Sequence, residues 1–489
     1  MTTRILPFST KVFWGIGQIG EGVKNSAFNS FLLFYYNQIL GVSATLTALA
    51  LAIAVFCDAI SDPLAGSISD RFESRWGRRH PFMAASAAPM SITLFLLFFP
   101  PSGMSEMFYF GWVLVFAISV RTFLTLYHIP HLALGAEMAT DYSDRSSLFS
   151  FGLFFGAVAG FGFYFTVLTL IFPPREGLLN GMYFAEGYPR MAATAAIIAF
   201  IAIMICVWGT RKEIPNLSKV IPATQRLSLN RVYNELRVAF SSPSYRSIFL
   251  GLMLGSVVLA VEAAFTPFMG IHFWGLETDQ LRLLPVGVLV GLPLGVVLAA
   301  LLSRVLDKKW CLIIPAAFTI INGNVLIILR LFELLPENGH WSILPLLIAS
   351  GFIGAVIAPV IFVTINSMFA DITDELELET GVRQEGIIYS ARAFAGKAAN
   401  GMGTIFGGLA LDFIAFPKQA QPGTVDADVI FNLGLVQGPA TSVFTLGGLL
   451  LYLGYKLSRT RHQEIVAELS LRRERQVESD LAEGAIGVD

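Results

Sequence analysis

The sequence predicts an all-α membrane protein with twelve transmembrane helices arranged as two six-helix halves. Of its 489 residues, 55% are hydrophobic and only 14% are charged, whereas a soluble domain carries about 25% charged residues. The hydrophobic residues form blocks long enough to cross a bilayer, which takes roughly 20 residues of helix for about 30 Å of hydrocarbon. Six such blocks lie on each side of one polar internal segment.

The first set of predicted spans covers residues 10–38, 43–70, 81–100, 106–138, 148–172 and 190–210. The second set covers residues 245–272, 280–303, 311–333, 342–370, 384–416 and 438–457. We therefore expect an N-terminal bundle with a cation site (1–210), a central loop (211–244), a C-terminal bundle (245–457) and a tail (458–489). The tail ends in the polar stretch RRERQVESDLAEGAIGVD, which we expect to be solvated and partly disordered.

Basic residues indicate that both termini and the central loop face the cytoplasm. Lys and Arg gather in the central loop, in the tail and after the second and eighth spans, while the loops around 101–105 and 334–341 have none. This asymmetry is typical of cytoplasmic loops. We expect a multi-pass monomer in the lipid bilayer, which for a bacterial chain is the inner (cytoplasmic) membrane. The net charge of −2 gives no indication of a nucleic-acid partner.

Two aspartates, Asp58 and Asp62, interrupt the second predicted span. They are four residues apart, so a helix places both carboxylates on one face. A carboxylate at the centre of a span costs roughly 2.5–3.5 kcal/mol on insertion scales, and two on one face repel each other. We expect the pair to bind Na⁺ or take up H⁺. The alternative is a structural pair, neutralised by a lysine or buried in its protonated form.

The ends of the fourth and tenth spans repeat each other. The chain reads ATDYSD from Ala139 to Asp144 and ADITD from Ala370 to Asp374. This repeat indicates a duplicated six-helix unit, the plan of major facilitator transporters, whose substrate site lies between the halves near the midplane. Charged residues at or after the cytoplasmic ends of the second, fourth and tenth spans are predicted to gate the transporter and not to bind substrate. They are Asp70, Arg71, Arg78, Asp141, Asp144, Arg145, Asp371, Asp374 and Arg383.

Three segments give the chain a more specific resemblance. They read DAISDPLAGSISDRFESRWGRRHPF (58–82), YHIPHLALGAEMATDYSDRSS (127–147) and TGVRQEGIIYSARAFAGKAANG (380–401). Together they resemble the glycoside–pentoside–hexuronide:cation symporters of the major facilitator superfamily. That family includes the melibiose permease type, and lysophospholipid symporters are related to it. The resemblance spans nearly the whole chain.

The resemblance implies a cation site at Asp58, Asp62 and Thr125. Ser61 stands where the family has an asparagine, and Lys397 matches a lysine of the eleventh span, which we expect to approach the two aspartates as a coupling residue. Carboxylate and hydroxyl oxygens suit a hard cation. The positions that recognise sugar in the family have changed, since they match Gly22 beside Glu21, His128, Leu132 and Leu153 here.

Several further charged residues lie within the predicted spans. Glu21 and Lys24 either pair with each other or meet the substrate, and Glu262 is the only acidic residue of the seventh span. Arg121 and Arg392 either pair with a carboxylate or bind an anionic group. We include these residues, Arg121 excepted, with the four replaced sugar positions in the predicted substrate site: Glu21, Gly22, Lys24, His128, Leu132, Leu153, Glu262 and Arg392. All seven tryptophans lie near predicted span ends, so we expect none to stack on a sugar at the midplane.

The sequence therefore predicts a symporter driven by Na⁺ or H⁺ that moves an organic solute by alternating access. A sugar or glycoside is the first expectation, a lysolipid or other amphiphile is the alternative, and a proton-coupled drug or metabolite antiporter is the second alternative. A non-transporting receptor on the same fold is a further possibility. The chain has no nucleophile–base motif, metal-ligand spacing or Gly-rich phosphate loop, so we expect no enzyme, no cofactor and no metal site beyond the transported cation.

Overall fold

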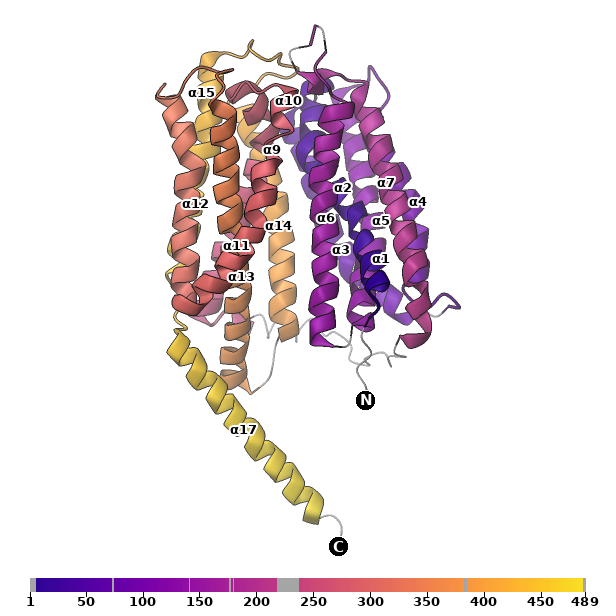
Figure 1. The fold of residues 1–489 in the computed structure, drawn as a ribbon, viewed down its shortest axis with the longest axis vertical. Coiled ribbons are helices and arrows are strands. Elements are labelled where there is room, and N and C mark those ends of the chain that lie inside the picture. The colour runs from indigo at the N-terminus through magenta and orange to yellow at the C-terminus, as the bar shows by residue number, and fades with distance from the viewer. Residues whose placement is uncertain are drawn as a thin grey trace.

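The computed structural model describes residues 6–72, 74–139, 141–175, 177–178, 180–217, 237–381 and 385–486. This part of the chain is helical apart from one isolated bridge between Arg175 and Leu178. Ten of its helical segments are long and apolar enough to span a membrane. A broken helix over residues 8–39 and the helix α14 lie alongside them and bring the number of spans to twelve (Figure 1). The predicted fold class is confirmed.

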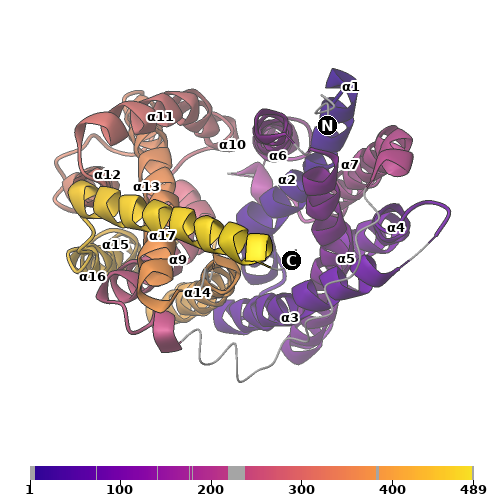
Figure 2. The ribbon, with the colours of Figure 1, turned by 90° about the horizontal axis from the view of Figure 1, so that it is seen from below.

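The N-terminal bundle contains α1 (Phe8–Ile16), α2 (Gln18–Ala27), α3 (Ala44–Arg71), α4 (His80–Leu97), α5 (Glu106–Met138), α6 (Tyr142–Leu170) and α7 (Gly187–Thr210). The C-terminal bundle contains α9 (Pro243–Phe268), α10 (Thr278–Leu281), α11 (Pro285–Val305), α12 (Lys308–Leu331), α13 (Ile343–Thr380), α14 (Glu385–Phe413), α15 (Ala427–Leu435) and α16 (Thr441–Tyr452). Figure 2 shows the two bundles side by side. Both chain ends lie on one side, which we call the terminal face (Figure 1); the other side is the opposite face.

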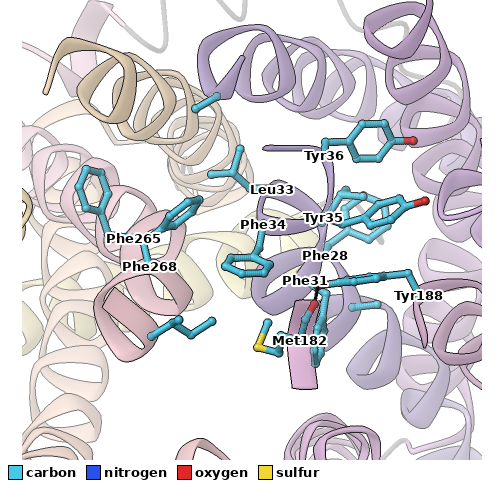
Figure 3. Packing of buried hydrophobic residues seen from close by; sticks show 14 of the residues in the cluster. Phe28, Phe31, Leu33, Phe34, Tyr35, Tyr36, Met182, Tyr188, Phe265 and Phe268 are labelled. Atoms are coloured by element: carbon cyan, nitrogen blue, oxygen red, sulfur yellow. Dashed lines mark hydrogen bonds between the residues drawn. The ribbon is translucent and has the colours of Figure 1, made fainter. Parts of the chain in front are cut away.

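Three short π-helical segments extend the helices near the opposite face. They cover Phe28–Leu32 and Tyr35–Ile39 after α2, and Met269–Phe273 after α9. Such wider turns inside helices often mark functional regions. Here they direct aromatic side chains toward the boundary between the bundles: the Phe34 ring lies 5.6 Å from Phe268 of the other bundle and 5.5 Å from Tyr183 (Figure 3). The buried aromatic core therefore joins the two bundles at this level.

Two predicted span boundaries differ from the structure by ten residues or more. The last span begins at Ala427 and not at 438, because a further π-helical segment, Val436–Ala440, carries the helix through Gln437, Gly438 and Pro439. The tenth span continues to Thr380, ten residues past its predicted end at 370, because its acidic final turns remain helical at the terminal face.

The tail is also a correction, because Arg459–Ile486 forms one helix, α17. Two of its apolar side chains, Ile465 and Leu469, are buried in the same cluster as Ile372 of α13. Arg472 donates to the Leu378 carbonyl at 2.8 Å, and Arg459 donates to the Ser303 carbonyl at 2.8 Å. All of these contacts join α17 to the C-terminal bundle. Its charged face is solvated, but burial of one side makes the segment helical.

Candidate functional site

Four side chains from three helices converge between the bundles. Thr125 Oγ1 of α5 lies 2.7 Å from Asp58 Oδ1 and 2.9 Å from Asp62 Oδ1, both on α3. Lys397 Nζ, on α14 of the other bundle, lies 3.1 Å from Asp58 Oδ2 and is also hydrogen-bonded to Asp62 Oδ2. The two acids share one face of α3, as their spacing requires. We call this group of four residues the carboxylate site.

A second cation, Arg121, approaches the carboxylate site from one turn earlier on α5. Its Nη1 lies 3.5 Å from Asp58 Oδ2, and its guanidinium group lies over the Phe28 ring at 5.8 Å. Two carboxylates thus face two fixed cations in a place where only 13% of the Asp58 side chain is exposed. Charges withdrawn from water to this extent need close partners. Ser61 donates its hydroxyl to the Asp58 backbone carbonyl at 3.1 Å, which leaves the lone pairs of its oxygen free to accept, so its predicted role in the cation site stays a prediction.

A cavity of about 900 Å³ lies between the two bundles. Its polar wall comes from residues 18–30, where polar side chains recur every three or four residues and so share one helix face. The residues of this wall are Gln18, Glu21, Asn25, Ser26, Asn29 and Ser30. The C-terminal bundle adds mainly apolar side chains, with Asn322, Ser350 and Gln437 as polar groups. Glu21 is the one charged side chain among the described residues that line the cavity.

Glu21 is paired with His128 and not with Lys24, the partner considered from the sequence. Its Oε2 lies 3.2 Å from His128 Nδ1 on α5. Lys24 is buried, donates to Asn25 Oδ1 at 2.7 Å and lies over the Phe28 ring, so the alternative of a Glu21–Lys24 pair is wrong. His128 follows Thr125 by three residues, which places it on the same side of α5. The cavity wall and the carboxylate site are therefore joined through α5.

His131 supports the cavity wall, although its sequence context does not mark it as a site residue. Its Nε2 lies 3.0 Å from the Trp14 carbonyl, so this nitrogen must carry a proton, and Nδ1 is left to accept from Gln18 Nε2 at 3.3 Å. Its ring stacks on Trp14, with centroids 4.4 Å apart. Since Trp14 and Gln18 line the cavity, His131 fixes part of its wall. Its position one turn after His128 was the only available signal.

The expectation that no tryptophan stacks on a sugar at the midplane stays a prediction. Trp14 and Trp274 both line the cavity. Trp14 lies near the end of a predicted span, and its indole turns inward and donates to the His131 carbonyl at 3.0 Å, so that only 1% of the residue is exposed. Trp274 lies directly after the π-helical segment that follows α9.

The other predicted substrate residues divide into two groups. Gly22 and Leu153 line the cavity. Leu132 does not line it and instead packs on the buried cluster around Trp14. Glu262 precedes the lining residue Ala263 but is not itself on the wall. Arg392 lies over the rings of Phe362 and Phe369, at 5.9 and 5.4 Å, away from the cavity wall.

Gly22 permits close packing of α2 on α6. A Cβ at this position would lie 2.2 Å from the Gly156 carbonyl oxygen, which is backbone and cannot rotate away. We expect Gly22→Ala to lower the stability of the protein by about 1–3 kcal/mol, the usual effect of overpacking, measured as a lower melting temperature in nanodiscs. Gly111→Ala is the matched control, because nothing lies within 4 Å of a Cβ there. Equal stability of the two variants would contradict this packing role.

The described residues among those predicted to gate all have partners within their own bundle at the terminal face. Arg78 lies 3.0 Å from Glu137, and Asp144 lies 2.8 Å from Lys11. In the second half, Asp371 lies 2.6 Å from Lys308, and both Asp371 and Asp374 contact His462 of α17. Two further contacts are Asp141 with the Asp144 amide and Arg145 with the Ala136 carbonyl. Arg383 and the side chains of Asp70 and Arg71 lie outside the described residues.

The fold and this arrangement define a transporter of a small solute, with two helical bundles around a central cavity. A family model described as "MFS/sugar transport protein" matches residues 13–459. The chain belongs to this family, which confirms the resemblance to glycoside–pentoside–hexuronide:cation symporters. It is a multi-pass membrane transporter and not an enzyme.

The chain is similar, at almost equal sequence identity, to relatives that are named for different cargoes. The chain is 24% identical to the isoprimeverose transporter of Lactiplantibacillus pentosus, over 83% of this chain and 80% of that protein. It is 24% identical to the glucuronide carrier protein homolog of Escherichia coli K12, over 97% and 99%. It is 23% identical to the sodium-dependent lysophosphatidylcholine symporter 1-A of Danio rerio, over 98% and 91%.

Among solved structures, the xylose transporter XylE of E. coli in an inward open conformation aligns with a TM-score of 0.60 at 16% identity. The alignment covers 94% of this chain and 99% of that one. This similarity supports the major facilitator fold alone.

Proposed function

We propose that this protein is a cation-coupled symporter in which Asp58, Asp62 and Thr125 bind Na⁺ or H⁺. The observation that carries the proposal is that Lys397, from the other bundle, occupies the space between both carboxylates. A lysine ammonium and a bound cation would compete for the same oxygens, since both satisfy the same negative charge. A cation can therefore be held only as Lys397 withdraws.

This competition supplies a coupling mechanism. With Lys397 in place, the carboxylate site and the adjacent Arg121 are neutral together, because the two cations balance the two acids. When the bundles move and α14 withdraws its lysine, the two acids facing Arg121 alone attract one positive charge. The bound cation then replaces Lys397, so occupancy of the site is linked to the relative position of the bundles. Alternating access of this kind uses a site at the boundary between the halves.

For the cargo we propose a neutral polyhydroxylated solute such as a glycoside. The polar wall offers amide, hydroxyl and carboxylate groups to hydroxyls. An anionic cargo would face Glu21 and would meet no Lys or Arg on the described walls, so its charge would stay unpaired. The apolar remainder of the cavity supports the second candidate, an amphiphile such as a lysolipid. We take the terminal face to be cytoplasmic, in line with the basic loops.

The test is thermal unfolding of the purified protein in nanodiscs, free of glycoside detergents. The probes are methyl β-glucoside, its uronic acid counterpart methyl β-glucuronide, and lysophosphatidylcholine, each in sodium or choline chloride at acidic and alkaline pH. A bound ligand at 100 times its Kd stabilises by about 2.7 kcal/mol. We expect the neutral glycoside to stabilise more than the glucuronide, and to do so only with Na⁺ or at low pH.

The outcomes separate the parts of the proposal. Stabilisation by a probe that is equal with and without Na⁺, and at both pH values, would contradict cation coupling. Tighter binding of the glucuronide would contradict the assignment of a neutral cargo. Stabilisation by lysophosphatidylcholine alone would select the amphiphile.

A further inference from the structure

The N-terminus of α3 is capped by a residue of the other bundle. Asp412, at the end of α14, accepts from the Thr45 amide at 3.0 Å, the Ala44 amide at 3.3 Å and the Ser43 hydroxyl at 2.6 Å. Amides in the first turn of a helix have no partner within that helix, and a carboxylate is favoured there by the helix dipole. A cap is usually supplied by a residue next to the helix in sequence. Ser43 supplies such a local cap to the Leu46 amide at 3.4 Å, and Asp412 adds a second cap from the other bundle.

A second set of contacts surrounds this cap. Lys418 lies 2.9 Å from Glu106, which also accepts from the Ser43 amide. Gln38 donates to the Pro417 carbonyl at 3.1 Å and accepts from the Ala420 amide at 2.9 Å. All of these contacts lie at the opposite face, where α3 begins and α14 ends. We call the cap and these contacts the outer latch.

The hydrogen bonds between described residues of the two bundles occur at two levels. The observed bonds lie at the opposite face or at the carboxylate site. The second flank of the opposite face is held by Asn180, which donates to the Leu276 carbonyl, and by Thr278, which accepts from the Gly181 amide. The described structure is therefore closed at the opposite face.

The cap can break and re-form without leaving a buried charge. Asp412 is exposed, so water replaces its bonds when α14 moves away, and the amides of α3 become hydrated as well. Close approach of the helices brings the cap into range, since a Cβ at Gly408 would lie only 2.6 Å from the Ala44 carbonyl oxygen. Lys397 and Asp412 then attach α14 to α3 at two points on one helix. Cation binding would release the first point only.

We propose that Asp412 is a positioning residue of the transport cycle: its cap on α3 holds the opposite face closed and sets the fraction of molecules in this state. This goes beyond the proposed function, because the closed fraction can be measured without cargo or coupling ion. We also expect the closed state to persist after Lys397 has left the carboxylates, until the cap opens.

The experiment measures the distance between spin labels at Ser102→Cys and Glu337→Cys, two exposed loop positions of different bundles on the opposite face. The background is the full chain in nanodiscs with Cys57, Cys206 and Cys311 replaced by alanine. We expect Asp412→Ala to raise the ratio of open to closed molecules about fivefold or more, as loss of a helix cap would. Asp428→Ala is the matched control, because it removes an exposed acid from the first turn of α15 in its own bundle.

A distance distribution in Asp412→Ala equal to that of Asp428→Ala would overturn the proposal. If Asp412→Ala does not fold, Asp412→Leu, which keeps the bulk of the side chain but has no acceptor oxygen, is measured in its place, and an unchanged distribution there counts equally against the cap. Cation-dependent stabilisation should be retained in either variant, since the carboxylate site is intact. Failure of the latch is thus distinguishable from failure of the proposed symport.

Discussion

Replacing Asp58 or Asp62 by asparagine is expected to reduce cation-driven concentrative uptake at least about 100-fold, which corresponds to about 2.8 kcal/mol of lost cation binding. Each carboxylate supplies oxygens to the same small site, and Thr125 lies within 2.9 Å of both. An amide keeps one oxygen but removes the negative charge that attracts Na⁺ or accepts H⁺. The measurement is uptake into proteoliposomes under an imposed cation gradient.

Either substitution leaves a cation at the site in excess, because Lys397 and Arg121 then face one carboxylate. Breaking a partly buried ion pair can destabilise a protein by about 3–5 kcal/mol, so melting temperature and size-exclusion profile must accompany the uptake data. The double variant Asp62→Asn with Lys397→Gln restores the balance of charge, so its melting temperature shows how much of any destabilisation comes from the unpaired lysine. Glu468→Gln, an exposed residue paired with Arg472 on α17, is the control. Concentrative uptake that persists in both single variants would refute the cation site.

Replacing Lys397 by glutamine is expected to tighten cation binding about tenfold, or about 1.4 kcal/mol, while abolishing concentrative uptake. Without the lysine, the two carboxylates retain only Arg121 as a fixed partner, so a mobile cation binds more strongly. The same change removes the competitor that ejects the cation, so the bundles no longer exchange the two ligands. Cargo exchange across the membrane should continue, because the cavity wall is unchanged.

The measurement for Lys397→Gln is the dependence of melting temperature on Na⁺ concentration and on pH, beside proteoliposome uptake and counterflow. Lys456→Gln removes an exposed lysine of the same bundle and serves as control. Cation affinity that is unchanged or weaker in Lys397→Gln would show that the lysine does not compete for the site. The competition model would then have to be abandoned even if Asp58 and Asp62 bind the cation.

The sequence was most informative where a residue conflicts with its surroundings. Asp58, Asp62 and Lys397 are charges within apolar helices, and such residues need a partner or a function, so they could be selected without coordinates. Asp412 was not selected, because an acid at the end of a span is ordinary and its cap on α3 depends on a tertiary contact. His131 was equally hidden, since an aromatic residue among apolar ones has many ordinary packing roles.

The errors have similar physical causes. The inward position of Trp14 depends on its contacts with His131 of α5, which is distant in sequence. The polar stretch from Arg472 is exposed where its side chains are described, as expected, but it continues the helix α17, whose apolar Ile465 and Leu469 are buried on α13. The acids predicted to gate were selected from the repeat, but their partners Lys11, Lys308 and His462 come from segments distant in sequence.

The attachment of α17 has a practical consequence. The helix contacts the C-terminal bundle through Arg459, His462 and Arg472 and extends well beyond it (Figure 1). It is therefore a lever arm that must turn as one piece with that bundle. A fluorophore on an exposed position of α17, paired with another on the N-terminal bundle, would magnify a small rotation between the halves into a large change in energy transfer.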